Sequence, residues 1–127
     1  MKLVNVSLAV VVSLVLIGCG AGHPNISSIT VTPQTATTTS TPQGQVGYTA
    51  MGNFTNGTSR ELSQADGLSW KTSTNAASIG ATGEATCLSP GTVTVTASAP
   101  ENLQITVNNG VNNTSTTITG SATLTCQ

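Results

Sequence analysis

Charged and aromatic side chains are scarce in this chain of 127 residues. Asp, Glu, Lys and Arg make up 6% of it, aromatic residues make up 2%, and the formal net charge is −1 at pH 7. So sparse a charge excludes both a basic surface for nucleic acid and an acidic groove for cationic partners. Electrostatic attraction is therefore not the expected means by which this protein finds a partner.

Catalytic motifs are also missing. Catalysis needs a base or nucleophile held against a partner group, yet the sequence has no GxSxG, HExxH or phosphate-binding loop, and His23 is its one histidine. Asp66-Gly67 predicts a turn, and Glu61 is expected to pair weakly with Arg60. The acidic residues stand alone rather than in the clusters that bind calcium: Glu61, Asp66, Glu84 and Glu101. We expect no enzymatic activity, no metal and no cofactor.

The longest apolar run lies at the N-terminus. Lys2 precedes an apolar segment, 8–17, of the length typical of a signal peptide. Leu16-Ile17-Gly18-Cys19 resembles the lipobox of bacterial lipoproteins, which implies cleavage before Cys19 and a lipid on its sulfur. The alternative is a short transmembrane anchor, but the run falls short of the roughly 20 residues that a spanning helix needs.

The resemblance to a lipobox implies how the chain is divided into segments and where in the cell the protein is located. We expect a lipoprotein signal peptide at 1–18, a tether anchored in the membrane by Cys19 at 19–27, and one folded domain at 28–127. The protein would be extracytoplasmic in a bacterial cell envelope. In a Gram-negative cell, Gly20 in place of Asp after the lipidated cysteine favours the outer membrane.

The expected domain is polar without being charged. Ser and Thr supply 38 of the 127 residues, 14 and 24 respectively, and Thr is favoured on the solvated face of a strand. Short segments of period-two alternation follow one another between turns, whereas no segment shows helical spacing. Alternation is expected in these segments: 28–32, 45–51, 68–72, 77–80, 83–88, 92–98 and 117–126. The pattern predicts an all-β sandwich of about seven short strands, while 35–41 is Thr-rich and loosely specified.

Residues 100–115 allow two interpretations. They form either a long polar loop or a hairpin with Asn109-Gly110 at its tip, a favoured two-residue turn. In the hairpin, facing residues have numbers that sum to 219, so Val95 would face Leu124 and Val93 would face Cys126. All such pairs are apolar, but Pro100 is expected to interrupt the ladder.

Two cysteines remain once Cys19 is assigned to lipid. Cys87 and Cys126 form an even pair in an oxidising compartment, and the hairpin register brings them to the same end of the sheet. We expect a structural disulfide. A redox or zinc site is the alternative, but the sequence has no CxxC motif and no nearby histidine.

The three aromatic residues, Tyr48, Phe54 and Trp70, lie at inward positions of the alternation. We expect them in the core. The alternative is a set of exposed rings that bind carbohydrate.

The segment 29–99 resembles the bacterial Ig-like domain, group 2 (BIg2, invasin/intimin-type). The resemblance rests on four pieces in the family's order: 29–33 (ITVTP), 48–52 (YTAMG), 53–58 with 70–73 (NFTNGT, WKTS), and 91–97 (GTVTVTA). It implies an immunoglobulin-like sandwich used as a spacer or adhesion module. About 28 residues follow the family's usual end, so the C-terminal extension and the Cys87–Cys126 pair depart from its pattern.

Function is less well specified than fold. The leading hypothesis is a lipid-anchored envelope module with a structural, spacer or protein-interaction role. A polysaccharide-binding module and an accessory subunit of an envelope secretion or enzyme complex are the alternatives. The expected partners are the membrane, through Cys19, and an envelope protein or polysaccharide, with no nucleic acid and no small-molecule substrate.

Overall fold

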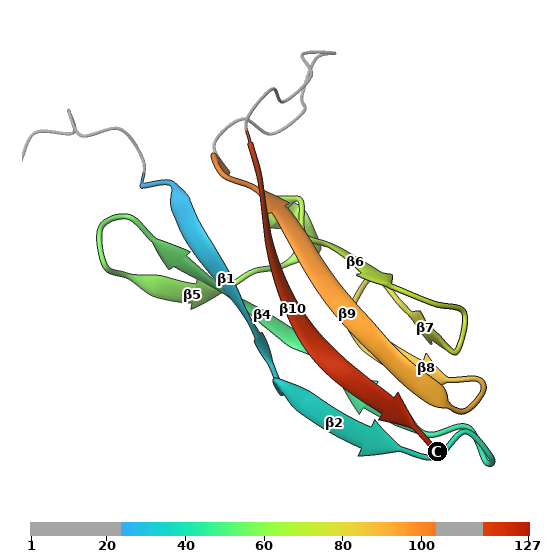
Figure 1. Ribbon diagram of the computed structural model, residues 1–127. Helices are drawn as coiled ribbons and strands as arrows, with labels where there is room; N and C mark the ends of the chain where they lie inside the picture. Colours follow the sequence, from blue (N-terminus) through green and yellow to red (C-terminus); the bar gives the residue numbers. More distant parts are fainter. Residues whose placement is uncertain (1–23, 104–115) are drawn as a thin grey trace, which may run out of the picture.

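The computed structural model describes residues 24–103 and 116–127, which form an all-β domain (Figure 1). A single 3-10 turn, η1 (Gln64–Asp66), interrupts the strands in this part of the chain. The strands are β1 (Ile26–Thr32), β2 (Thr35–Thr38), β3 (Gln45–Gly47), β4 (Thr49–Phe54), β5 (Ser59–Glu61), β6 (Ser69–Thr72), β7 (Ala77–Ile79), β8 (Glu84–Cys87), β9 (Gly91–Pro100) and β10 (Thr117–Cys126).

The strands form the two layers of an immunoglobulin-like sandwich. One layer is a four-stranded sheet in the order β2-β10-β9-β6. The other consists of β1-β4-β5 and β3-β8-β7, which are continuous because β3 and β4 are two halves of one path, interrupted at Tyr48. This matches the arrangement of the fold, in which strands A, B, E and D face strands C, F and G.

The described chain has ten strands where about seven were predicted, and the difference has a local cause. Pro33 divides the first path into β1, which pairs with β4, and β2, which pairs with β10 in the other sheet. Tyr48 divides the second path into β3 and β4. If β1 with β2 and β3 with β4 are each counted as one strand, and the short edge strand β5 is left out, the count is the predicted seven.

The folded domain also begins earlier than predicted. Ile26 and Ser27 were assigned to the tether at 19–27, but they are the first residues of β1. Ile26 is 1% exposed, and its backbone N–H donates to the carbonyl oxygen of Glu101 at 2.9 Å. Burial of this side chain brings the start of the domain forward to residue 26.

β9 and β10 form the long antiparallel pair that the hairpin interpretation requires, but the predicted register was wrong by two residues. Leu124 faces Val93 and Ala122 faces Val95, so facing numbers sum to 217 rather than 219. A shift of two residues keeps every side chain on its expected face. Pro100 is the last residue of β9 and faces Thr117 rather than breaking the ladder. The predicted tip, Asn109-Gly110, lies outside the described residues.

Small side chains dominate the core between the layers. Six of its seventeen buried apolar residues are alanines: Ala50, Ala77, Ala85, Ala97, Ala99 and Ala122. The largest fully buried side chains are aliphatic and include Ile26, Val31 and Leu124. Because alanine buries little apolar surface, the sheets must approach closely to exclude water.

The two layers approach closely where β1 crosses β10. A Cβ atom built on Gly120 would collide with the backbone carbonyl of Ile29, so only glycine fits at this crossing. β10 thereby supports β1 from the opposite layer while pairing with β2 and β9 in its own sheet.

We predict that Gly120→Ala destabilises the domain by about 1–3 kcal/mol, the typical effect of overpacking a tight contact. The measurement is the free energy of unfolding in urea. Gly47→Ala is the matched control, because a Cβ at Gly47 meets nothing within 4 Å. Equal stability of the two variants would contradict the proposed crossing.

Candidate binding surface

The outer side of the four-stranded sheet is covered by Thr and Ser hydroxyl groups, and we call this surface the hydroxyl face. Inward positions of β9 and β10 hold apolar residues, and the outward positions hold Thr and Ser. The face comprises Thr35, Thr37, Ser69, Thr92, Thr94, Thr96, Ser98, Thr117, Thr119, Ser121, Thr123 and Thr125. The strand register aligns these residues in rows across the sheet.

Two such rows each join three strands. Thr35 faces Thr123, which faces Thr94. Thr37 faces Thr125, which faces Thr92. Neighbours in a row are separated by the strand spacing of about 4.8 Å, so hydroxyl groups repeat regularly across the sheet.

The hydroxyl groups of this face have no hydrogen-bond partner among the described residues, whereas several hydroxyls on the outside of β1-β4-β5 are partnered. There, the Asn53 amide donates to the hydroxyls of Ser28 and Thr30, each at 3.0 Å. The Ser59 hydroxyl donates to Asn53 Oδ1 at 2.9 Å. Asn53 thus binds part of the outside of β1-β4-β5 together, whereas the hydroxyl face is left to solvent or a ligand.

A shallow groove, largely open to solvent, adjoins the hydroxyl face between β6 and β7. Its volume is about 490 Å³. The lining combines apolar and polar side chains, among them Trp70, Lys71, Asn75, Ser78, Ile79 and Leu88. We call it the β6–β7 groove. Lys71 belongs to both features, because on β6 it faces Thr96 of the hydroxyl face.

The predicted core aromatics differ in burial. Tyr48 is 2% exposed, and Phe54 and Trp70 are half-buried and pack against the core. The Tyr48 and Trp70 rings are tilted with centroids 6.4 Å apart, and both also line a smaller cavity of about 220 Å³. Burial raises the pKa of Tyr48, so its hydroxyl remains neutral at physiological pH. Among the described residues this hydroxyl has no hydrogen-bond partner.

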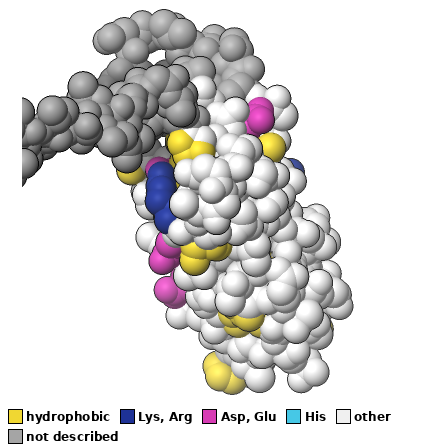
Figure 2. Space-filling view, turned by 90° about the vertical axis from the view of Figure 1, so that its left-hand side faces the viewer, with side chains coloured by type: hydrophobic (Ala, Val, Ile, Leu, Met, Phe, Trp, Pro, Cys, Tyr) yellow, Lys and Arg dark blue, Asp and Glu magenta, His cyan; other side chains and the backbone are white. Residues whose placement is uncertain are grey.

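Arg60 forms an ion pair with Asp66 rather than with Glu61, the expected partner. Two guanidinium nitrogens donate to the Asp66 carboxylate at 2.7 and 2.9 Å. The guanidinium also lies 5.6 Å from the centroid of the Phe54 ring. Figure 2 shows several basic and acidic side chains one above another along one edge of a surface that is otherwise largely uncharged.

The electrostatics of this pair follow from its geometry. Hydrogen bonds from Arg60 are the main cause that lowers the pKa of Asp66, helped by the backbone N–H of Ser63 at 2.9 Å. The same hydrogen bonds raise the pKa of Arg60. The expectation failed because Arg60 and Glu61 are neighbours on β5, and neighbouring residues of a strand lie on opposite faces. The η1 turn brings Asp66 back to Arg60 instead.

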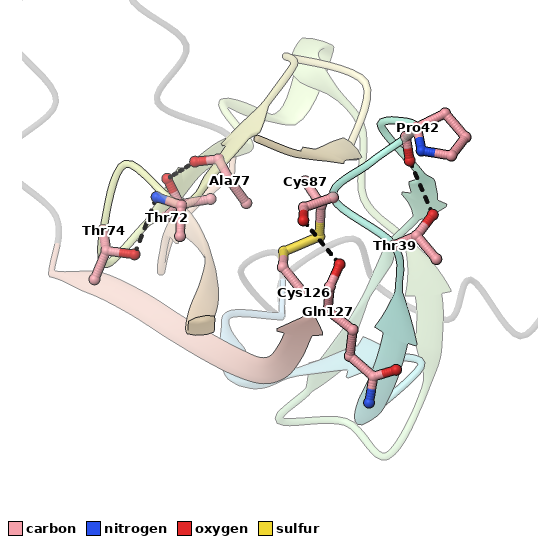
Figure 3. The surroundings of a disulfide bond; sticks show 10 residues. Thr39, Pro42, Thr72, Thr74, Ala77, Cys87, Cys126 and Gln127 are labelled. Carbon is pink, nitrogen blue, oxygen red and sulfur yellow. Dashed lines mark hydrogen bonds between the residues drawn. A yellow bond between two sulfur atoms is a disulfide. The ribbon is translucent and has the colours of Figure 1, made fainter. Parts of the chain in front are cut away.

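The predicted disulfide is present. Cys87 of β8 and Cys126 of β10 are bonded, with Cα atoms 5.6 Å apart and a sequence separation of 39 (Figure 3). Both side chains are buried, at 0% and 3% exposed. Because β8 and β10 belong to different layers, the bond joins the two sheets.

The C-terminus is held beside the disulfide. The Ser40 hydroxyl donates to the backbone carbonyl of Gln127 at 2.8 Å, and the Gln127 N–H donates to the carbonyl of Thr38 at 2.9 Å. These bonds continue the pairing of β2 with β10 past Cys126.

One predicted site residue lies outside the described part: Cys19, assigned to lipidation, belongs to segment 1–23. Within 24–103 and 116–127, no three acidic, histidine or cysteine side chains gather as a metal site. The same residues include no helix long and apolar enough to cross a bilayer.

Sequence reasoning missed the groove residues Asn75 and Leu88 and the bridging amide of Asn53. The predicted alternation ended at residue 51; continued by two residues, it places Asn53 outward, as it lies on β4. Asn75 lies in a connection between strands, where period-two patterns give no direction for a side chain. Leu88 was the last residue of the predicted segment 83–88, but β8 ends at Cys87.

No protein-family model and no curated protein matches this chain. The resemblance to BIg2 is therefore a prediction carried by the residues quoted for it.

We predict that the Cys87→Ala/Cys126→Ala double variant loses about 4 kcal/mol of unfolding free energy, because the loop closed by the bond constrains the unfolded chain. Urea unfolding of oxidised protein and of the double variant measures the difference. Mass spectrometry of protein isolated from cells checks the premise. Free thiols at both positions would show that the bond does not form there.

We also predict that Asp66 contributes to stability at neutral pH and that this contribution is lost in acid. Its pKa is lowered in the folded state, so the stabilisation is present above the unfolded carboxyl pKa of about 4 and disappears as pH falls through the folded value. Asp66→Asn should flatten this part of the curve of unfolding free energy against pH. Glu61→Gln, which removes a carboxylate outside the ion pair, is the matched control. Identical curves for wild type and Asp66→Asn would refute the assignment.

Proposed function

We propose that this chain is a lipid-anchored, extracytoplasmic immunoglobulin-like module of the bacterial cell envelope. Its role is structural, as a spacer or a platform for protein interaction, and non-catalytic. The proposal joins the lipobox-like sequence to the sandwich that follows it.

The observation that carries the proposal is the position of the two ends of the domain. β1 begins at Ile26, only seven residues after Cys19, beside the end of β9 (Figure 1). A tether of seven residues reaches at most about 25 Å. The C-terminus and the disulfide lie at the opposite end of β10.

This arrangement suits a spacer. The ten residues of β9 and of β10 extend for about 33 Å, and they lead from the anchored end to the distal end. A lipid on Cys19 would hold the first end near the bilayer and present the second away from it.

We predict that Cys19→Ser abolishes membrane anchoring. Wild-type protein should incorporate labelled fatty acid and enter the detergent phase on partitioning, whereas the variant should do neither. Gly20→Asp is the matched control: it should keep the label, and in a Gram-negative host it should move the protein towards the inner membrane. Labelled Cys19→Ser protein would contradict the proposal.

Crosslinking in intact cells separates the two structural roles. A defined partner protein, recovered with the wild type and lost with Cys19→Ser, would support the interaction role. Recovery of no such partner would support the spacer role.

A further inference from the structure

We propose that the β6–β7 groove and the hydroxyl face together bind a polysaccharide strand that carries carboxylates. This activity goes beyond anchoring and spacing, because it assigns a ligand to the side of the sandwich. Three independent observations support it: the lining of the groove, the unpartnered hydroxyls and the position of Lys71.

The groove has the mixed chemistry that a sugar ring requires. A pyranose has apolar C–H faces and a rim of hydroxyls. Trp70, Ile79 and Leu88 provide apolar surface, and Leu88 is 45% exposed. Asn75 and Ser78 provide hydrogen-bonding groups along the same lining. An aromatic side chain can pack against the face of a sugar ring while nearby polar groups form hydrogen bonds with the hydroxyls at the edge of that ring.

The hydroxyl face extends this groove across the sheet. Ser69 and Lys71 of β6 face Ser98 and Thr96 of β9, and these continue to Thr119 and Ser121 of β10. A Thr or Ser hydroxyl both donates and accepts, as sugar hydroxyls do. Since these groups have no partner among the described residues, an extended chain can bind them without breaking a protein hydrogen bond.

The charge at the junction selects the class of polysaccharide. Lys71 is exposed and lines the groove. Among the described residues it forms no ion pair, because the pair there joins Arg60 and Asp66. No acidic residue occupies an outward position on β2, β10, β9 or β6. An ammonium group without a neighbouring carboxylate favours a ligand that brings its own, as a uronic acid does.

The test uses the fluorescence of Trp70, the only tryptophan in the chain. The mature protein, isolated from cells in detergent, is titrated with polygalacturonate as the acidic probe and dextran as the neutral one. Polygalacturonate should change the emission saturably at low salt, and dextran should act only at much higher concentration. No saturable change with polygalacturonate, or an equal response to dextran, would overturn the proposal.

Two pairs of variants locate the surface. Lys71→Gln should weaken polygalacturonate binding about fivefold, the upper range for an exposed ion pair, whereas Arg60→Gln, with the same change in net charge, should leave it within about twofold. Thr94→Val/Thr96→Val should weaken binding further than Thr55→Val, which removes an exposed hydroxyl outside the face. Unfolding midpoints show that each variant is folded. Equal weakening by Lys71→Gln and Arg60→Gln would mean that only net charge matters, and would overturn the proposal.

Discussion

The distance between the two sheets is the constraint on which this structure depends. A core in which six of seventeen buried apolar residues are alanines gains little from each side chain, because hydrophobic stabilisation scales with the apolar area removed from water. The layers must therefore lie close over their whole length. Gly120 permits this where β1 crosses β10, and the Cys87–Cys126 bond enforces it at the distal end.

Strand existence was readable from the sequence because strict alternation leaves little choice of face. The segment 117–126 became β10 with the predicted boundaries and with its apolar residues inward. Register was less readable. Alternation repeats every two residues, so the observed register (facing numbers that sum to 217) and the predicted one (219) place the same side chains on the same faces. The proposed turn at Asn109-Gly110 was too weak a signal to choose between the two registers.

Elements that depend on tertiary contacts were not readable. β2 has the sequence Thr-Ala-Thr-Thr, which contains almost no apolar pattern, and it is a strand because β10 pairs with it in parallel. Asp66 meets Arg60 only after β5 and the η1 turn have formed. The proposed binding surface combines both situations: its hydroxyl rows follow from alternation, whereas Asn75 and Leu88 reach the groove through connections.

The disulfide links the two parts of the proposed binding surface. Cys126 belongs to β10, which carries part of the hydroxyl face, and Cys87 is followed at once by Leu88 of the groove. The Leu88 N–H donates to the carbonyl of Ala76 at 2.7 Å, which fixes the connection that also contains Asn75. A bond that joins the layers at this end thus holds the groove wall in position against the hydroxyl rows. Rigidity of this kind lowers the entropy cost of binding, so the same bond that stabilises a thin core also prepares the surface for an extended ligand.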